Sequence, residues 1–249
     1  MATVLWTINE FEEIDSTNTW LVARAKEGAP HGTVARADFQ TAGRGRLDRS
    51  WEAPRGVSLL TSILLAPRVS LEQLPVVTAS VALAASRGLT RLCGLAPTVK
   101  WPNDLIVNDR KLGGILSELV DVVDGFPRIV VGLGLNLQWP GPEGVGATCV
   151  RDEVGVSIAP RAMLDILLAE LELILPLCET SDGRQEIAQA YRNVLATRGR
   201  TVRVEMVDGS SIVGVVADVN DDGALLVDVD GTEVAVRSGD VFHLRETLA

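Results

Sequence analysis

The chain has few of the residues that build disulfide frameworks, metal centres or membrane anchors. It contains only three cysteines, Cys93, Cys149 and Cys178, and two isolated histidines. Because the cysteines are odd in number and widely spaced, they predict the reduced thiols of a cytoplasmic protein rather than disulfides or zinc ligands. Apolar runs such as 57–66 contain polar residues and are too short to cross a bilayer. The first residues lack the basic start and apolar core of a signal peptide.

Positive charge is also scarce. The 249 residues include 33 acidic and 23 basic side chains, for a formal net charge of −10 at pH 7. This sign argues against a nucleic-acid-binding surface, because such a surface must neutralise phosphates. With 47% apolar residues, the chain is long and apolar enough for one large globular domain with a small one attached.

Lysine is rarer than arginine. Only three of the basic residues are lysines, Lys26, Lys100 and Lys111. Two of them lie in segment 99–118, which reads VKWPNDLIVNDRKLGGILSE. An ammonium is a compact point charge that reaches a phosphate or carboxylate oxygen, and a guanidinium does not simply replace it. We interpret Lys100 and Lys111 as residues of a binding or catalytic site. The alternative is that a few lysines were retained by chance.

Arginine and glycine alternate in segment 40–51, which reads QTAGRGRLDRSW. Glycine lets a backbone turn sharply and approach a ligand closely. Arginine supplies a planar fork of donors that matches carboxylate and phosphate oxygens. The segment therefore predicts a loop that folds over a small anionic ligand and ends in a large aromatic, Trp51. A solvated basic loop is the competing interpretation.

Hydrophobic periodicity predicts alternating helices and strands. Asp15 or Ser16 is expected to cap a helix that ends near Gly28. Asn108 and Asp109 predict a hairpin turn. Strands are expected at 33–38, 57–65, 105–107, 112–123 and 128–137, and helices at 71–89, 161–177 and 184–195.

The character of the chain changes near residue 198. Short valine-rich strands separated by Asp-Gly turns then predict a small barrel of SH3-like size. Residues 198–249 hold five arginines, no lysine and ten acidic residues, a balance that disfavours an RNA platform. We expect a catalytic domain over 1–197 and an appended contact or lid module over 198–249.

Five short motifs occur in order along the chain. They are Ser16-Thr17-Asn18, segment 40–51, segment 100–104, segment 111–116 and segment 132–136. Together with the C-terminal barrel, they resemble the biotin–protein ligases of the short, monofunctional type. The resemblance implies an α/β (α+β) fold: a mixed β-sheet with flanking helices, as in class II synthetase-like ligases, plus a small SH3-like β-barrel. Because the catalytic match begins within the first two dozen residues, no N-terminal helix-turn-helix is expected.

The resemblance also implies a two-step reaction. Biotin and ATP, with Mg²⁺, give biotinyl-5′-AMP and pyrophosphate, and a lysine of a biotin carboxyl carrier domain then attacks the mixed anhydride. The implied partner is that carrier domain of acetyl-CoA carboxylase or a related carboxylase. Neither nucleic acid nor membrane is expected as a partner. The protein is expected to act in the cytoplasm as a monomer or a weak homodimer.

Site residues follow from the same resemblance. The catalytic set is Lys111, Arg44 and Arg46, the cations expected to bracket a carboxylate and a phosphate. The expected biotin contacts are Ser16, Thr17, Asn18, Gln40, Arg44, Gly45, Arg46, Lys111, Gly114, Ile115 and Leu116. The expected ATP or adenylate contacts are Arg44, Arg46, Trp51, Lys100, Asn103, Lys111 and Asn136.

Purely structural roles are the alternatives for several of these residues. Ser16 and Asn18 could serve as helix caps, Trp51 as a core residue and Asn136 as a turn residue. Asp104 could hold Mg²⁺ or act as a structural cap, so no protein metal ligand is assigned.

One departure from the family pattern concerns Asp48, which stands where the loop commonly has a third glycine. Aspartate tolerates left-handed backbone geometry better than most residues, so the turn is expected to survive, and Asp48 could pair with a neighbouring arginine.

Three other functions remain open. A lipoyl ligase or octanoyl transferase shares the implied fold, and the transferase would need a cysteine nucleophile, for which Cys149 is the candidate. A non-catalytic biotin-binding sensor is the second alternative, although the retained lysines and loop arginines speak against it. Nucleic-acid binding is a distant third.

Overall fold

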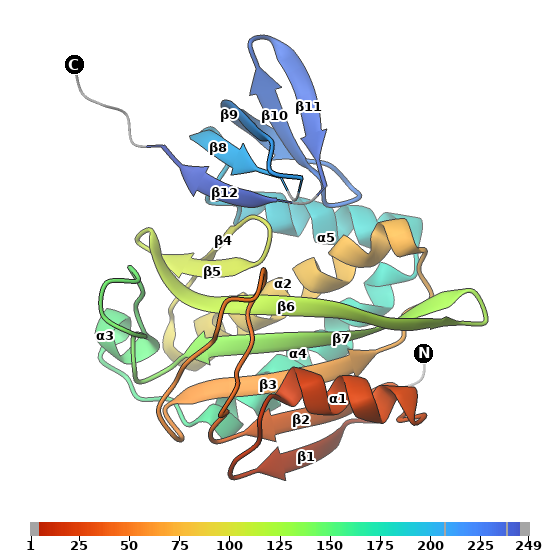
Figure 1. Ribbon diagram of the computed structural model, residues 1–249, viewed down its shortest axis with the longest axis vertical. Coiled ribbons are helices and arrows are strands. Elements are labelled where there is room, and N and C mark those ends of the chain that lie inside the picture. The colour runs from red at the N-terminus through yellow and green to blue at the C-terminus, as the bar shows by residue number, and fades with distance from the viewer. Residues whose placement is uncertain (1–4, 207, 238, 245–249) are drawn as a thin grey trace.

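The computed structural model describes residues 5–206, 208–237 and 239–244, which form two β-sheets with helices packed around the larger one (Figure 1). The larger sheet has seven strands in the order β1-β2-β3-β7-β6-β5-β4. The β1–β2 pair is parallel and the other pairs are antiparallel, so the expected mixed sheet is confirmed. The strands are β1 (Thr7–Phe11), β2 (Thr33–Ala37), β3 (Ser58–Leu65), β4 (Thr98–Lys100), β5 (Asp104–Val107), β6 (Arg110–Val123) and β7 (Phe126–Asn136).

Helices cover both faces of this sheet. Figure 1 shows α1 in front of the strands, and α2 and α4 behind them. Every residue of the inner strand β3 is buried, because both of its faces meet other elements. The helices are α1 (Thr17–Lys26), α2 (Leu74–Cys93), α3 (Val150–Val154), α4 (Pro160–Cys178) and α5 (Ser181–Asn193), with a short 3-10 helix at Leu71–Gln73.

Local sequence signals set several boundaries. Ser16 is the N-cap of α1, and its hydroxyl accepts a hydrogen bond from the Thr19 amide. Gly94 ends α2 in the left-handed region, with φ of 75°. Asn108 and Asp109 turn the β5–β6 hairpin with φ of 51° and 60°, as the two-residue turn predicted.

The sequence patterns did not predict three short elements, namely β1, β4 and α3. The strand β4 has only three residues, and β1 lies at the sheet edge with a mixture of polar and apolar residues. Neither gives a periodic signal of useful length. The helix expected at 71–89 begins with the 3-10 turn and continues to Cys93. Within the described ranges, no helix has the length and apolar character that a membrane span requires.

The second sheet has five antiparallel strands in the order β11-β10-β9-β8-β12. This number matches the expected SH3-like module, but the sheet is not closed into a barrel: in the described residues β11 and β12 form its two edges. The indole of Trp101 donates to the Gly223 carbonyl at 3.0 Å and so links the two sheets. The strands are β8 (Thr201–Glu205), β9 (Ser211–Val219), β10 (Leu225–Val229), β11 (Thr232–Val236) and β12 (Asp240–His243).

Candidate functional site

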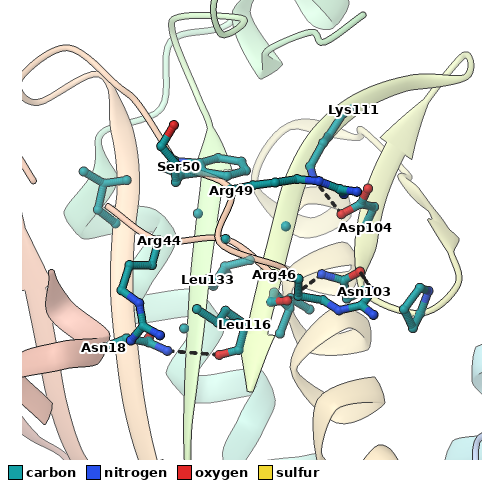
Figure 2. A pocket seen from close by; sticks show the side chains of 18 of the residues that line it. Asn18, Arg44, Arg46, Arg49, Ser50, Asn103, Asp104, Lys111, Leu116 and Leu133 are labelled. Atoms are coloured by element: carbon teal, nitrogen blue, oxygen red, sulfur yellow. Dashed lines mark hydrogen bonds and ion pairs between the residues drawn. The ribbon is translucent and has the colours of Figure 1, made fainter. Parts of the chain in front are cut away.

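A cavity of about 200 Å³ lies where α1, the arginine–glycine loop, strands β6 and β7 and strand β12 meet. Of the residues expected to bind biotin or ATP, all line this cavity except Asn136. The motifs lie as much as a hundred residues apart in the chain, and the sheet order brings them to one place. Figure 2 shows Asn18, Arg44, Arg46, Asn103 and Lys111 around it.

The arginine–glycine loop is itself a small hairpin, and we call residues 43–51 the flap. The Gly45 amide donates to the Arg49 carbonyl at 2.6 Å, and the Trp51 amide donates to the Gly43 carbonyl at 2.9 Å. A side chain at Gly43 would place its Cβ 2.3 Å from the Trp51 carbonyl oxygen, so only glycine fits. The two ends of the flap therefore lie close together over the sheet.

The flap tip has left-handed backbone geometry at two residues, Leu47 with φ of 52° and Asp48 with φ of 57°. Asp48 thus adopts the geometry of the glycine that it replaces, as expected. Leu47 shares that geometry, which the sequence did not indicate. Among the described residues Asp48 forms no ion pair, so the expected pairing with a neighbouring arginine is not seen.

Trp51 lies flat on a glycine-lined floor. A Cβ on Gly134 would lie 2.4 Å from the Trp51 ring, and one on Gly114 would lie 3.2 Å from it. The Lys111 ammonium is 5.6 Å from the centre of the same ring. The glycines of β6 and β7 therefore leave room for an aromatic wall beside the lysine.

One end of the cavity is polar and neutral. Gln40 accepts hydrogen bonds from the Thr17 amide at 2.7 Å and from the Thr17 hydroxyl at 2.9 Å. Asn18 donates to the Leu116 carbonyl at 3.2 Å. Ser62 places its hydroxyl 2.8 Å from the Thr17 hydroxyl and 2.5 Å from the Asn18 amide oxygen. These side chains are held in fixed orientations before any ligand binds.

The other end is cationic. Lys111 Nζ lies 2.8 Å from Asp104 Oδ1, on the neighbouring strand. Burial lowers the pKa of Lys100, and the negative charge of Asp104 opposes that shift. Arg46 Nη1 donates to the Asn103 amide oxygen at 3.2 Å, and Asn103 in turn donates to the Ile115 carbonyl at 2.7 Å.

Sequence reasoning missed three polar residues at or beside this cavity: Ser62, Glu118 and Asp240. Glu118 accepts from Asn18 at 2.8 Å and pairs with Arg44 at 3.0 Å, so it orients both. Ser62 stands with Thr61 between the apolar residues of β3, which is the one local signal that could have been used. Asp240 lies about two hundred residues from the flap that it contacts, and no local pattern marks it.

Comparison with known proteins decides the family. Residues 10–136 match the model of the biotin/lipoate A/B protein ligase family, and residues 197–244 match the biotin protein ligase C-terminal domain. The chain belongs to this ligase family. It is 38% identical over 242 residues to a biotin–[acetyl-CoA-carboxylase] ligase of Mycobacterium tuberculosis, covering 92% of this chain and 86% of the relative. A ligase of the same name from Paracoccus denitrificans is 28% identical, covering 92% and 97%.

A solved structure agrees with these sequence matches. The biotin protein ligase of Aquifex aeolicus in complex with biotin and ATP has a TM-score of 0.80 and 26% identity, covering 96% of this chain and 99% of its own. The ligase fold that the sequence resemblance implied is therefore confirmed.

Asn136 lies outside the cavity of this ligase family member. It is buried, and its amide donates to the Pro140 carbonyl at 3.2 Å and the Thr148 carbonyl at 3.1 Å. Both amide hydrogens thus hold the segment that follows β7. Its expected contact with ATP remains a prediction, and the geometry favours the competing structural role.

A transferase of this family would need an accessible thiolate. Cys149 is fully buried, and burial raises its pKa, so the thiolate form is disfavoured. Cys178 is also buried, with its pKa raised for the same reason.

His243 lies at the other end of the chain, in β12. Burial, Lys100 and Arg200 together lower the pKa of His243 to about 4, which leaves that ring neutral near pH 7.

Proposed function

We propose that this chain is an ATP-dependent biotin–protein ligase. It activates biotin to biotinyl-5′-AMP with release of pyrophosphate and transfers the biotinyl group to a lysine of a carboxylase carrier domain. The observation that carries the proposal is one cavity with a neutral, hydrogen-bonding end and a cationic end, in a member of the ligase family. Biotin has the same polarity, with a neutral ureido ring at one end and a carboxylate at the other.

The neutral end fits the ureido ring. A urea needs donors and acceptors held in fixed directions, and Thr17, Asn18 and Gln40 offer hydroxyl and amide groups of both kinds. Ile115 and Leu116 line the same cavity and supply contacts for the apolar bicyclic ring and its chain. This arrangement supports binding of biotin with its carboxylate toward the arginines and lysines.

The cationic end addresses the main obstacle of the first step. A biotin carboxylate oxygen must attack the α-phosphorus of ATP although both groups are negative, and pyrophosphate leaves as the new bond forms. Arg46 and Lys111 come from the flap and β6 to this end of the cavity, whereas Arg44 pairs with Glu118 beside Asn18 at the neutral end (Figure 2). Positioned cations offset the repulsion and stabilise charge on the phosphoryl oxygens. Lys100 adds a further positive charge at this end.

The second step transfers the biotinyl group. The lysine amine of the carrier attacks the carbonyl carbon of the mixed anhydride, loses a proton, and AMP leaves. Lys111 and Arg46 stabilise the phosphate of the leaving AMP as they stabilised the first transition state. The flap covers the anhydride and limits the access of water, since Trp51 at its end packs on Gly114 of β6 and Gly134 of β7.

Magnesium would be held mainly by phosphate oxygens. Within the described ranges, no group of three or more histidine, cysteine or acidic side chains forms a cage for a metal ion. Asp104 and Asp240 nevertheless bring carboxylate oxygens to the cationic end of the cavity, a donor type that suits Mg²⁺. We propose Asp104 as the protein oxygen nearest the ion. The ion would supply charge neutralisation on the phosphates.

Transfer of labelled biotin to a purified carboxylase carrier domain tests the function. The assay is run with and without ATP and Mg²⁺, beside a lipoate control. We expect ATP-dependent labelling of one carrier lysine by biotin and none by lipoate. Labelling by lipoate alone would overturn the assignment of biotin as the substrate. Biotin binding without transfer would favour a non-catalytic biotin-binding sensor. Because the reaction consumes ATP and the three cysteines are free thiols, we also propose a cytoplasmic location.

A further inference from the structure

The flap depends on contacts outside its own hairpin. Two-residue hairpin turns with left-handed geometry favour Asn-Gly, whereas this tip has Leu47 and Asp48. Leucine disfavours the left-handed region because its Cβ crowds the following carbonyl oxygen. The local sequence therefore does not select the turn, and tertiary contacts must stabilise it.

Those contacts converge on Asp240, the first residue of β12. Its carboxylate pairs with Arg49 and lies 3.4 Å from Arg46 Nη1, while the Gly239 carbonyl accepts from Arg46 Nη2 at 3.1 Å. The Asp240 side chain is only 13% exposed and Arg46 is also largely buried, so solvent screens their pair weakly, whereas Arg49 is exposed and its pair is screened more. Figure 1 shows the flap (orange) rising in front of β7 and β6 toward the C-terminal sheet.

The Asp240 carboxylate projects from a strand that is paired with its neighbour. Asp240 faces Glu205 in the β8–β12 ladder, and a Cβ on Gly239 would lie 2.7 Å from the Glu205 carbonyl oxygen. Asp240 also lines the cavity, and its charge raises the pKa of Lys100 against the effect of burial. One acidic side chain of the C-terminal sheet thus faces three cations of the cationic end.

We infer that Asp240 is a positioning residue that fastens the flap over the cavity and slows the escape of the acyl adenylate. The inference rests on the proposed function, and it assigns the C-terminal sheet a direct part in retaining the intermediate. Because Asp240 and Asn103 both hold Arg46, less side-chain conformational entropy is lost when a phosphate binds. Loss of the carboxylate removes one ion pair from Arg46 and one from Arg49 at once.

Tryptic cleavage of the protein alone gives the first test. Trypsin cuts after Arg44, Arg46 and Arg49 only when the flap opens, and mass spectrometry follows the three bonds. We expect Asp240→Asn to be cut there about tenfold faster than the original chain, the size expected for loss of a charged hydrogen-bonded pair. Asp240→Glu should restore much of the protection. Asp230→Asn is the matched control, since Asp230 is an exposed aspartate on another turn of the same sheet.

Release of preformed adenylate gives the second test, followed as biotinylation of bystander lysines on an inert protein. We expect release to be about tenfold faster in Asp240→Asn, with transfer to the carrier lowered less. Arg49→Gln should act in the same direction but more weakly, because Arg46 keeps its contact with Asp240, and adding it to Asp240→Asn should change little, because Arg49 acts through that carboxylate. Additive effects, or unchanged cleavage in Asp240→Asn, would overturn the inference. Absence of any adenylate would overturn the proposed function, and tryptic cleavage still decides the role of Asp240.

Discussion

Replacing Lys111 with alanine separates catalysis from folding in this protein. The ammonium pairs with Asp104 at 2.8 Å and lies 5.6 Å from the Trp51 ring, and its side chain is 38% exposed. An exposed ion pair contributes about 0.2–1 kcal/mol, and an exposed cation–π contact contributes about 0.5–1 kcal/mol. Against a typical stability of about 5–15 kcal/mol, the variant remains folded.

The effect on the first step is expected to be much larger. Removal of one preorganised group that stabilises transition-state charge typically costs about 10²- to 10³-fold in rate. Biotin-dependent exchange of pyrophosphate into ATP measures this step without a carrier protein, and thermal unfolding measures stability in parallel. Lys26→Ala is the matched control, because Lys26 lies exposed in the last turn of α1. Near-normal exchange in Lys111→Ala would refute the assignment of this lysine.

Three further predictions concern other parts of the molecule. Gly134→Ala should displace Trp51, because the added Cβ would lie 2.4 Å from its ring. Titration calorimetry should show that the affinity for biotin is lowered about tenfold. Unchanged affinity would place Trp51 outside the binding site. Leu47→Asn should relieve about 1 kcal/mol of left-handed strain and slow tryptic cleavage of the flap, whereas faster cleavage would contradict the strain argument. His243 has its pKa lowered to about 4 by burial and by nearby cations including Lys100, so between about pH 4 and 6.5 the unfolded chain binds more protons. The free energy of unfolding should therefore fall as the pH drops through that window. Urea titrations at several pH values should show that this free energy depends less on pH in His243→Gln.

Much of the fold could be predicted because its signals are local. The cap at Ser16, the turn at Asn108 and Asp109, and the long apolar helices each depend on neighbours within a few residues. The elements that were missed, β1, β4 and α3, are short, and they owe their conformation to the elements they pair or pack with.

The candidate site divides in the same way. The sequence by itself indicated which side chains are candidates for the chemistry, since two lysines and three arginines stand in short motifs that also hold glycines. These properties belong to residue types and to their nearest neighbours. The tertiary structure decided why Gly43 and Gly134 must be glycine, because a side chain at either position would collide with Trp51.

Only the tertiary structure decided which distant groups hold those side chains. Glu118 meets Arg44 because β6 lies under the flap, and Asp240 meets Arg46 because β12 lies above it. Strand order and register determine such pairs, and a slip of one residue would turn each side chain to the other face. Asn136 follows the same rule: it ends a glycine-rich motif, yet its position in the sheet directs its amide to the following segment rather than to the cavity.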